Sequence, residues 1–161
     1  MPRPYVPAMP VEPAVDAVRT GALPFERAGD VVAPLLDAIG DARMVLIGEA
    51  SHGTHEFYRI RAELTSALID RKAFDIVAVE ADWPDAYRAS RWVRLQSDEP
   101  DAAAALGGFT RFPRWMWRND VVVDFLGWLR ESNRSRTPPH RIGFYGLSTA
   151  CTPPLKRSFG T

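Results

Sequence analysis

The stretch Met44-Val45-Leu46-Ile47-Gly48-Glu49-Ala50-Ser51-His52-Gly53-Thr54-His55-Glu56 is an apolar run that ends abruptly in acid, hydroxyl and imidazole groups. Its first four residues show no alternation of apolar and polar side chains, which is typical of a strand covered on both faces. A carboxylate, two hydroxyls and an imidazole follow within one short turn. Such turns lie at the carboxyl edge of a parallel sheet, where α/β proteins usually place their ligands. The stretch therefore predicts a buried strand that leads into a polar site.

Outside this stretch, helical stripes of apolar residues alternate with short apolar runs. The runs of strand length are residues 43–48, 75–80 and 141–147. The stripes with helical spacing begin near Asp30, His55, Trp83 and Asn119. This order predicts an α/β fold, a three-layer domain with a mainly parallel sheet and flanking helices. In such a sheet, Glu49 and Glu80 at two strand ends reach the same edge.

The composition is that of an ordinary globular chain. Of its 161 residues 46% are hydrophobic and 25% are charged, which suits one domain with a sizeable core. Twenty Lys and Arg balance twenty Asp and Glu, so no net field recruits nucleic acid or an anionic membrane. A single cysteine, Cys151, allows no intramolecular disulfide, and no apolar run approaches the roughly 20 residues of a membrane helix. We expect a cytoplasmic protein that binds neither nucleic acid nor membrane.

Four motifs follow one another along the chain. They are Gly48-Glu49-Ala50-Ser51-His52-Gly53-Thr54-His55-Glu56-Phe57, Val79-Glu80-Ala81-Asp82-Trp83-Pro84, Gly108-Phe109-Thr110-Arg111-Phe112-Pro113 and Trp115-Met116-Trp117-Arg118-Asn119. Together they resemble the erythromycin esterase family. The resemblance covers residues 30–147 and corresponds to the amino-terminal part of a family member. It implies an α/β hydrolase of a small-molecule ester, in the best-known members the macrolactone of erythromycin, without a serine nucleophile. We expect no cofactor other than a possible divalent metal.

The segments at both ends differ from the family pattern. Residues 1–29 are expected to form a proline-rich arm and lead-in, and residues 148–161 a tail unlike the family. Family members usually continue after the equivalent of Leu147 with an Asp and a Leu-Tyr pair. Plausible codons for residues 148–152, read in a shifted frame, restore both features, which suggests a frameshift. We therefore expect residues 30–147 to be an incomplete domain, with an open sheet edge, an uncovered apolar face and impaired catalysis.

The resemblance also assigns the catalytic residues. His52 matches the base that activates water, and an imidazole with its unperturbed pKa of about 6.5 suits that task near neutral pH. Glu49 and Glu80 are the carboxylates that can orient the imidazole. Arg61 can meet a carboxylate or a developing oxyanion. A serine hydrolase is weakly supported, because no Gly-x-Ser-x-Gly elbow surrounds Ser51.

Two further groups of residues leave alternatives open. Trp115, Trp117 and Arg118 are candidates for an apolar substrate cleft, although an aromatic-rich loop more often packs on itself. Suitable ligands for a divalent metal are His52, Glu49, His55 and Glu80. Metal-assisted hydrolysis is therefore one alternative, and a non-catalytic module that binds a small molecule is another.

Overall fold

The computed structural model describes residues 11–22, 24–111 and 113–148 of the chain. Within these residues the sheet has two parallel strands, β1 (Ile76–Asp82) and β2 (Gly143–Ser148), with Ile76 opposite Gly143. The connection between them contains α4 (Trp83–Val93), α5 (Ala102–Ala105) and α6 (Asp120–Arg134). Parallel strands need such a long crossover. The α/β class and the parallel pairing predicted from the sequence are confirmed.

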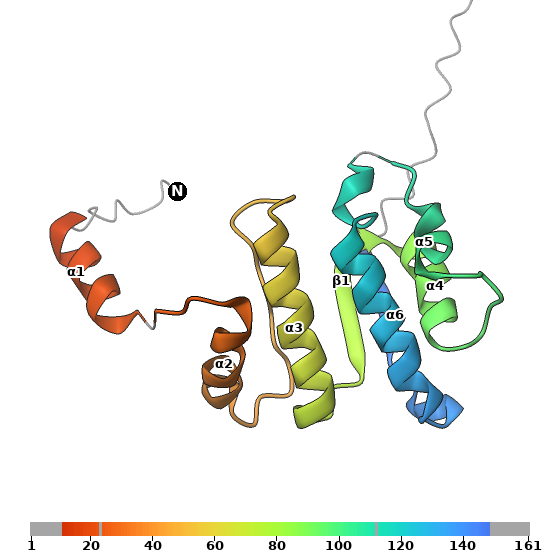
Figure 1. Ribbon diagram of the computed structural model, residues 1–161, viewed down its shortest axis with the longest axis horizontal. Helices are drawn as coiled ribbons and strands as arrows, with labels where there is room; N and C mark the ends of the chain where they lie inside the picture. The colour runs from red at the N-terminus through yellow and green to blue at the C-terminus, as the bar shows by residue number, and fades with distance from the viewer. Residues whose placement is uncertain (1–10, 23, 112, 149–161) are drawn as a thin grey trace, which may run out of the picture.

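In the described part of the chain, three α-helices precede the sheet (Figure 1). The longest, α3 (His55–Lys72), starts directly after the polar turn and carries Arg71 and Lys72 in its last turn, where cations oppose the helix dipole. Next to it packs α2 (Val32–Ile39). The first helix, α1 (Val11–Gly21), stands apart from the body. The sequence predicts an extended arm up to Pro13, but the helix begins at Val11, and Pro13 falls in its first turn, where proline is tolerated. Short 3-10 turns lie at Ala28–Val31, Leu106–Gly108, Arg114–Met116 and Pro138–His140.

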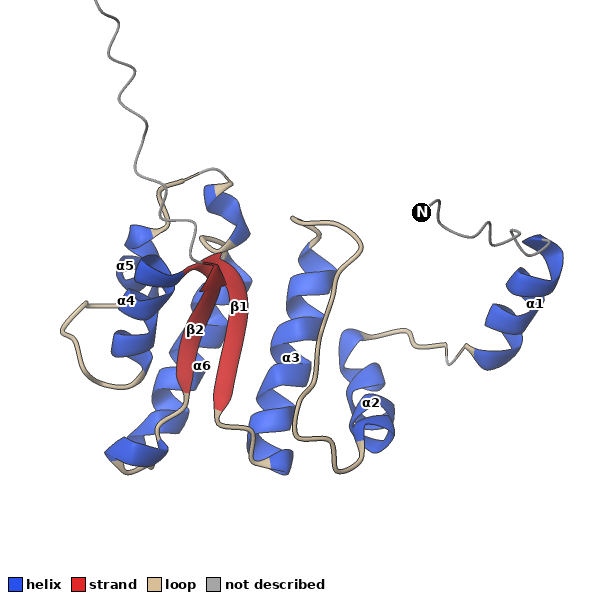
Figure 2. Ribbon diagram, turned by 180° about the vertical axis from the view of Figure 1, so that it is seen from behind, coloured by secondary structure: helices blue, strands red, loops and turns tan. Residues whose placement is uncertain are grey.

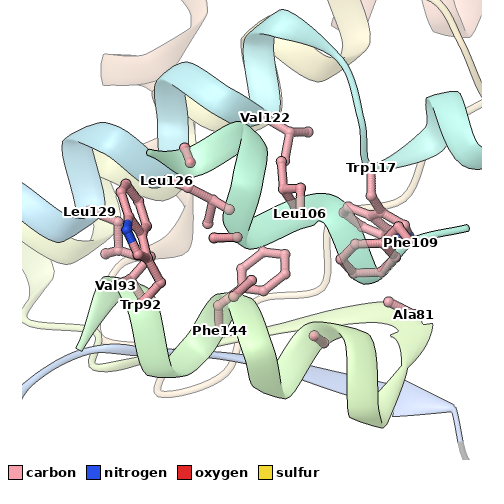
Figure 3. Close-up of a cluster of buried hydrophobic side chains, with 14 of the residues drawn as sticks. Ala81, Trp92, Val93, Leu106, Phe109, Trp117, Val122, Leu126, Leu129 and Phe144 are labelled. Carbon is pink, nitrogen blue, oxygen red and sulfur yellow. The ribbon is translucent and has the colours of Figure 1, made fainter. Parts of the chain in front are cut away.

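The main hydrophobic core lies between the two strands and helices α4, α5 and α6. Figure 3 shows Phe144 of β2 in this core, with the rings of Phe109 and Trp117 at one end. The Trp117 ring meets Phe144 edge-on at a centroid distance of 6.0 Å. Leu106 and Leu126 are fully buried. These contacts join residues that are far apart in the sequence.

Asn133 joins three elements inside this core. Its side-chain Nδ2 donates hydrogen bonds to the carbonyl oxygens of Val93 and Ile142, both at 2.9 Å. Its Oδ1 accepts one from the backbone N–H of Ile142 at 2.8 Å. The buried amide thereby satisfies backbone groups at the end of α4 and before β2, which would be costly to leave unpaired.

Residues 43–49, here called the extended segment, lie outside the sheet. Their side chains alternate: Val45 and Ile47 pack on the cluster formed by α2 and α3, whereas Met44 and Leu46 are 76% and 85% exposed. The predicted strand at residues 43–48 is therefore right in its extended conformation and wrong in its sheet membership. Sheet membership requires a hydrogen-bonded neighbour, and among the described residues β1 pairs with β2 alone.

The described helices cover one face and one edge of the sheet. Val77 and Val79 pack against the core, whereas Ile76 and Ala78, which alternate with them, are exposed. Figure 2 views the strands from the exposed side. At the far edge of β2, the backbone N–H of Phe144 donates to Ser90 Oγ of α4 at 3.2 Å. The second helical layer of a three-layer domain is not formed by the part of the chain that the structure describes.

Candidate active site

Glu49 is the centre of the candidate site. It ends the extended segment, and its side chain is only 9% exposed. Each carboxylate oxygen has its own partner: Oε1 meets Nδ1 of His52, and Oε2 accepts a hydrogen bond from Nη2 of Arg61. Arg61 projects from the second turn of α3. The helix that follows the polar turn therefore also holds the Glu49 carboxylate in place. Three of the four predicted catalytic residues are thus in direct contact.

The contact with Glu49 fixes which nitrogen of His52 faces outward. Because Nδ1 meets the carboxylate, Nε2 is the nitrogen left for a reactant, and the ring makes no second hydrogen bond to any described residue. The His52 side chain is 47% exposed, so solvent and small molecules reach it. A neutral imidazole whose Nδ1–H donates to a carboxylate presents a lone pair at Nε2. This arrangement can accept a proton from water.

His52 opens into a cleft of about 490 Å³. One wall is formed by the polar turn and the start of α3, with His55 and Tyr58, and the other by Trp115. Gly53 lies where the two walls meet. It has a positive φ of 85°, and a Cβ there would lie 3.1 Å from the Trp115 ring. The backbone conformation favours glycine, and any larger residue would also have to displace the Trp115 ring slightly.

Tyr58 is a site residue that the sequence did not reveal. It is 6% exposed, and its hydroxyl makes no hydrogen bond of normal geometry. The pKa of the Tyr58 hydroxyl is raised mainly by burial and to a smaller extent by the negative charge of Glu49. The nearby Gly53 backbone acts in the opposite direction. The Arg61 guanidinium lies 5.6 Å from the Tyr58 ring centroid. The spacing of three residues from Arg61, which places both on one face of α3, is the signal that could have found it.

Other predicted site residues lie away from His52. Glu80 is exposed on β1 and makes no hydrogen bond or ion pair within residues 11–22, 24–111 and 113–148. Trp117 is 9% exposed and packs in the core, because the 3-10 turn at Arg114–Met116 directs its ring inward and that of Trp115 outward. Arg118 is exposed and does not line the cleft. Within the described ranges, no three His, Cys, Asp or Glu side chains are gathered so as to hold a metal ion.

A second charged group lies at the carboxyl end of β1. Asp82, the last residue of the strand, forms an ion pair with Arg111 at 2.9 Å. Burial, and next the charge of Asp82, raise the pKa of Asp85. The sequence singled out Glu80 as the acid that closes this strand, whereas the strand continues for two more residues. Asp82 therefore takes the position at the strand end.

The parallel strands and the helices around them define an α/β protein. The chain belongs to the erythromycin esterase family, because the family model described as erythromycin esterase matches residues 69–156, more than half of its length. Erythromycin esterase type II of Escherichia coli is 29% identical over 114 residues, which are 71% of this chain and 25% of that protein. Erythromycin esterase type I of Escherichia coli is 31% identical over 100 residues, 62% of this chain and 24% of that protein. The chain spans about a quarter of the length of these relatives.

Two solved structures share the fold. One is described as a succinoglycan biosynthesis protein, with a TM-score of 0.67 and 21% identity over 85% of this chain and 34% of that chain. The other is a protein from Bacillus cereus, with the same TM-score and identity over 87% of this chain and 33% of that chain. This chain corresponds to about a third of each of these two solved chains. None of the described helices has the length and apolar character needed to cross a bilayer.

Proposed function

We propose that this chain carries the water-activating part of an ester hydrolase site, with His52 as the general base and a carboxylic ester or macrolide lactone as the substrate. The observation that carries the proposal is the contact between Glu49 and Nδ1 of His52, fixed from the other side by Arg61. The names of the two Escherichia coli relatives support an ester substrate. Glu80 is a secondary candidate, since it has no contact with His52.

In the proposed reaction, Nε2 of His52 takes a proton from a water molecule as the water oxygen attacks the ester carbonyl carbon. Glu49 stabilises the resulting imidazolium. Arg61 keeps the Glu49 carboxylate oriented towards the ring. The imidazolium then returns the proton to the leaving alcohol, which completes the hydrolysis. A positioned general base typically contributes about 10²–10⁴-fold to the rate.

The cleft suits an organic substrate. Trp115 offers an apolar wall on the side opposite the polar turn, and it is 45% exposed, so part of its ring is free for contact. Substrate pockets usually combine such apolar surface with a few polar groups. We propose Trp115 as the substrate-binding residue of the aromatic loop. Trp117 and Arg118 do not line the cleft in this structure.

The test compares two histidines of the same cleft. Both His52 and His55 line it, but only His52 contacts Glu49. In hydrolysis of a chromogenic ester and of erythromycin, His52→Asn should lower the rate of the chain at least about a hundredfold. His55→Asn should retain the rate within a few-fold. Hydrolysis that does not depend on His52 would contradict the proposal.

Two added measurements address the alternatives. Dialysis against a chelator should leave the rate unchanged, and a loss restored by a divalent metal would favour metal-assisted hydrolysis. Erythromycin that quenches tryptophan fluorescence without being hydrolysed would favour a binding module.

A further inference from the structure

We infer that the free edge of β1 and the extended segment (residues 43–49) accept one further parallel strand between them. The strand would be supplied by the part of an erythromycin esterase domain that lies outside the region matched by these 161 residues. This inference concerns assembly of the sheet and is independent of the hydrolytic role of His52.

The first argument is the unpaired backbone of the extended segment. Its residues make no hydrogen bond through their backbone N–H or C=O groups to any described residue. Apolar extended segments are normally paired with neighbours, because unpaired backbone groups cannot be buried without cost. The period-two burial of Val45 and Ile47 shows that the segment already has the side-chain alternation of a strand.

The second argument is the asymmetry of the two-stranded sheet. The outer edge of β2 is covered by α4, where Ser90 accepts a hydrogen bond from the backbone N–H of Phe144. The opposite edge, formed by β1, has no strand beside it in the described residues. Native sheets usually cover or interrupt a free edge. The open side of this sheet is the side on which the extended segment lies (Figure 2).

The third argument is that the extended segment and β1 rest on the same helix. Val45 and Ile47 pack with Leu64 and Leu68 of α3, and Val77 and Val79 pack in the cluster that contains Ile69 of α3. In Figure 2 the extended segment runs alongside α3 in the direction of the β1 arrow. A helix is about 10–12 Å across, which covers two strand spacings of about 4.8 Å. One strand therefore fits between the two edges.

The exposed side chains indicate which side of the enlarged sheet is still to be covered. Met44 and Leu46 point away from α3, as does Ile76 of β1, which is 64% exposed. Leu147 of β2 is 71% exposed. The source of the strand is argued from length, because this chain spans 25% and 24% of the two curated relatives. The remaining three quarters of such a protein can supply both the strand and the layer above it.

The first experiment measures the spacing with cysteine pairs in a Cys151→Ser background. Paired strands lie about 4.8 Å apart, and cysteines with Cα atoms more than about 7 Å apart form no disulfide. Each variant carries one cysteine in the extended segment, at Met44 or Leu46, and one in β1, at Ile76 or Ala78. These two cysteines should form no disulfide. A bis-maleimide of about 10 Å should link them, because it spans two strand spacings. Ala78→Cys with Tyr145→Cys, which are partners in the β1–β2 register, is the positive control. A disulfide between the extended segment and β1 would overturn the inference.

The second experiment identifies the occupant by amide hydrogen exchange. The probe is the Escherichia coli type II enzyme without the segment that this chain matches, co-purified with the full 161-residue chain. In the chain alone, the amides of residues 43–49 and of the free edge of β1 should exchange fast. When the probe is bound, exchange at both sets of amides should become at least about a hundredfold slower, because local opening becomes rarer. Protection of one edge or of neither would overturn the inference. Protection that grows with the concentration of the chain alone would assign the edge to a second copy and would overturn it equally.

A matched set of variants completes this test. Leu46→Lys with Ile76→Lys changes side chains that are 85% and 64% exposed, so the chain should fold while the complex with the probe is lost. Val18→Lys changes an apolar side chain that is 69% exposed on α1, away from the sheet. It should leave the complex intact.

Discussion

At the scale of single residues, the candidate site depends on one carboxylate shared by two partners. Glu49 holds the His52 ring with one oxygen and meets Arg61 with the other. Its side chain is only 9% exposed, so water cannot replace either contact freely. Arg61 thus both compensates the charge of Glu49 and sets its orientation.

Replacing Arg61 should therefore destabilise the fold as well as the site. Arg61→Ala leaves a largely buried carboxylate without its cation, and the free energy of unfolding should fall by about 1–3 kcal/mol. Arg59→Ala is the control, because Arg59 is 62% exposed and pairs with Glu63 on the surface of α3. It should change stability by less than about 1 kcal/mol. Urea unfolding followed by circular dichroism measures both, and equal effects would contradict the role given to Arg61.

Tyr58 gives the site a pH signature. Burial, and next the charge of Glu49, raise its pKa above the usual value of 10.0. The folded protein therefore keeps the phenol proton to a higher pH than the unfolded chain. The contribution of Tyr58 to the free energy of unfolding is fully present below pH 10 and is lost as the pH rises further. Tyr58→Phe should flatten the alkaline fall in unfolding free energy, whereas Tyr87→Phe, at an exposed ring, should not. If the free energy of unfolding falls equally for wild type and Tyr58→Phe between pH 8 and about 11, the pH dependence does not come from Tyr58.

At the scale of elements, the contact between β1 and β2 depends on a glycine. A Cβ at Gly146 would lie 2.5 Å from the carbonyl oxygen of Ala81 and 2.9 Å from that of Asp82. Gly146→Ala should therefore displace one strand and lower the free energy of unfolding by about 1–3 kcal/mol. Gly127 is the control, since a Cβ there meets nothing within 4 Å and the residue lies inside α6. Gly127→Ala should stabilise by about 0.5–1 kcal/mol, so thermal melts of the two variants should shift in opposite directions.

The elements also show how far the sequence can predict the structure. Local signals locate the helices well: α3 starts at His55, and α6 follows the Asn119 cap, whose side chain accepts from the Val122 backbone N–H. Sheet membership is not local, which is why residues 43–48 have a strand pattern and no strand partner in the described chain.

Within the site, contacts between residues close in the sequence could be predicted, whereas contacts between residues far apart in the sequence could not. The contact between Glu49 and His52 was within reach of prediction because the two residues are three apart. The burial of Trp117 was not, because it depends on Phe144, which is 27 positions away.

At the scale of the whole molecule, one face of the sheet is uncovered by the described residues and, apart from Glu80, carries apolar side chains on β1. Met44, Leu46, Ile76 and Leu147 are all more than 60% exposed on it or beside it. Exposed apolar patches of this kind usually mark surfaces that another part of a protein covers.

This face should bind a hydrophobic dye while the chain is folded. 1-Anilinonaphthalene-8-sulfonate should fluoresce with the native chain, and Leu46→Lys with Ile76→Lys should remove most of that signal. Val18→Lys should remove little of it. Circular dichroism on the same samples checks that all three proteins keep their helices. A double variant with undiminished dye fluorescence would show that the dye binds elsewhere.

The long connection between the two strands has a consequence for how the chain is made. Roughly sixty residues of helix and loop separate the end of β1 at Asp82 from the start of β2 at Gly143. A ribosome adding about 5–20 residues per second needs about 3–12 s to travel that distance. Throughout that interval β1 has been synthesised and the strand that pairs with it has not. The pairing of β1 with β2 therefore cannot begin until the ribosome has passed Ser148, and until then β1 must wait without this partner.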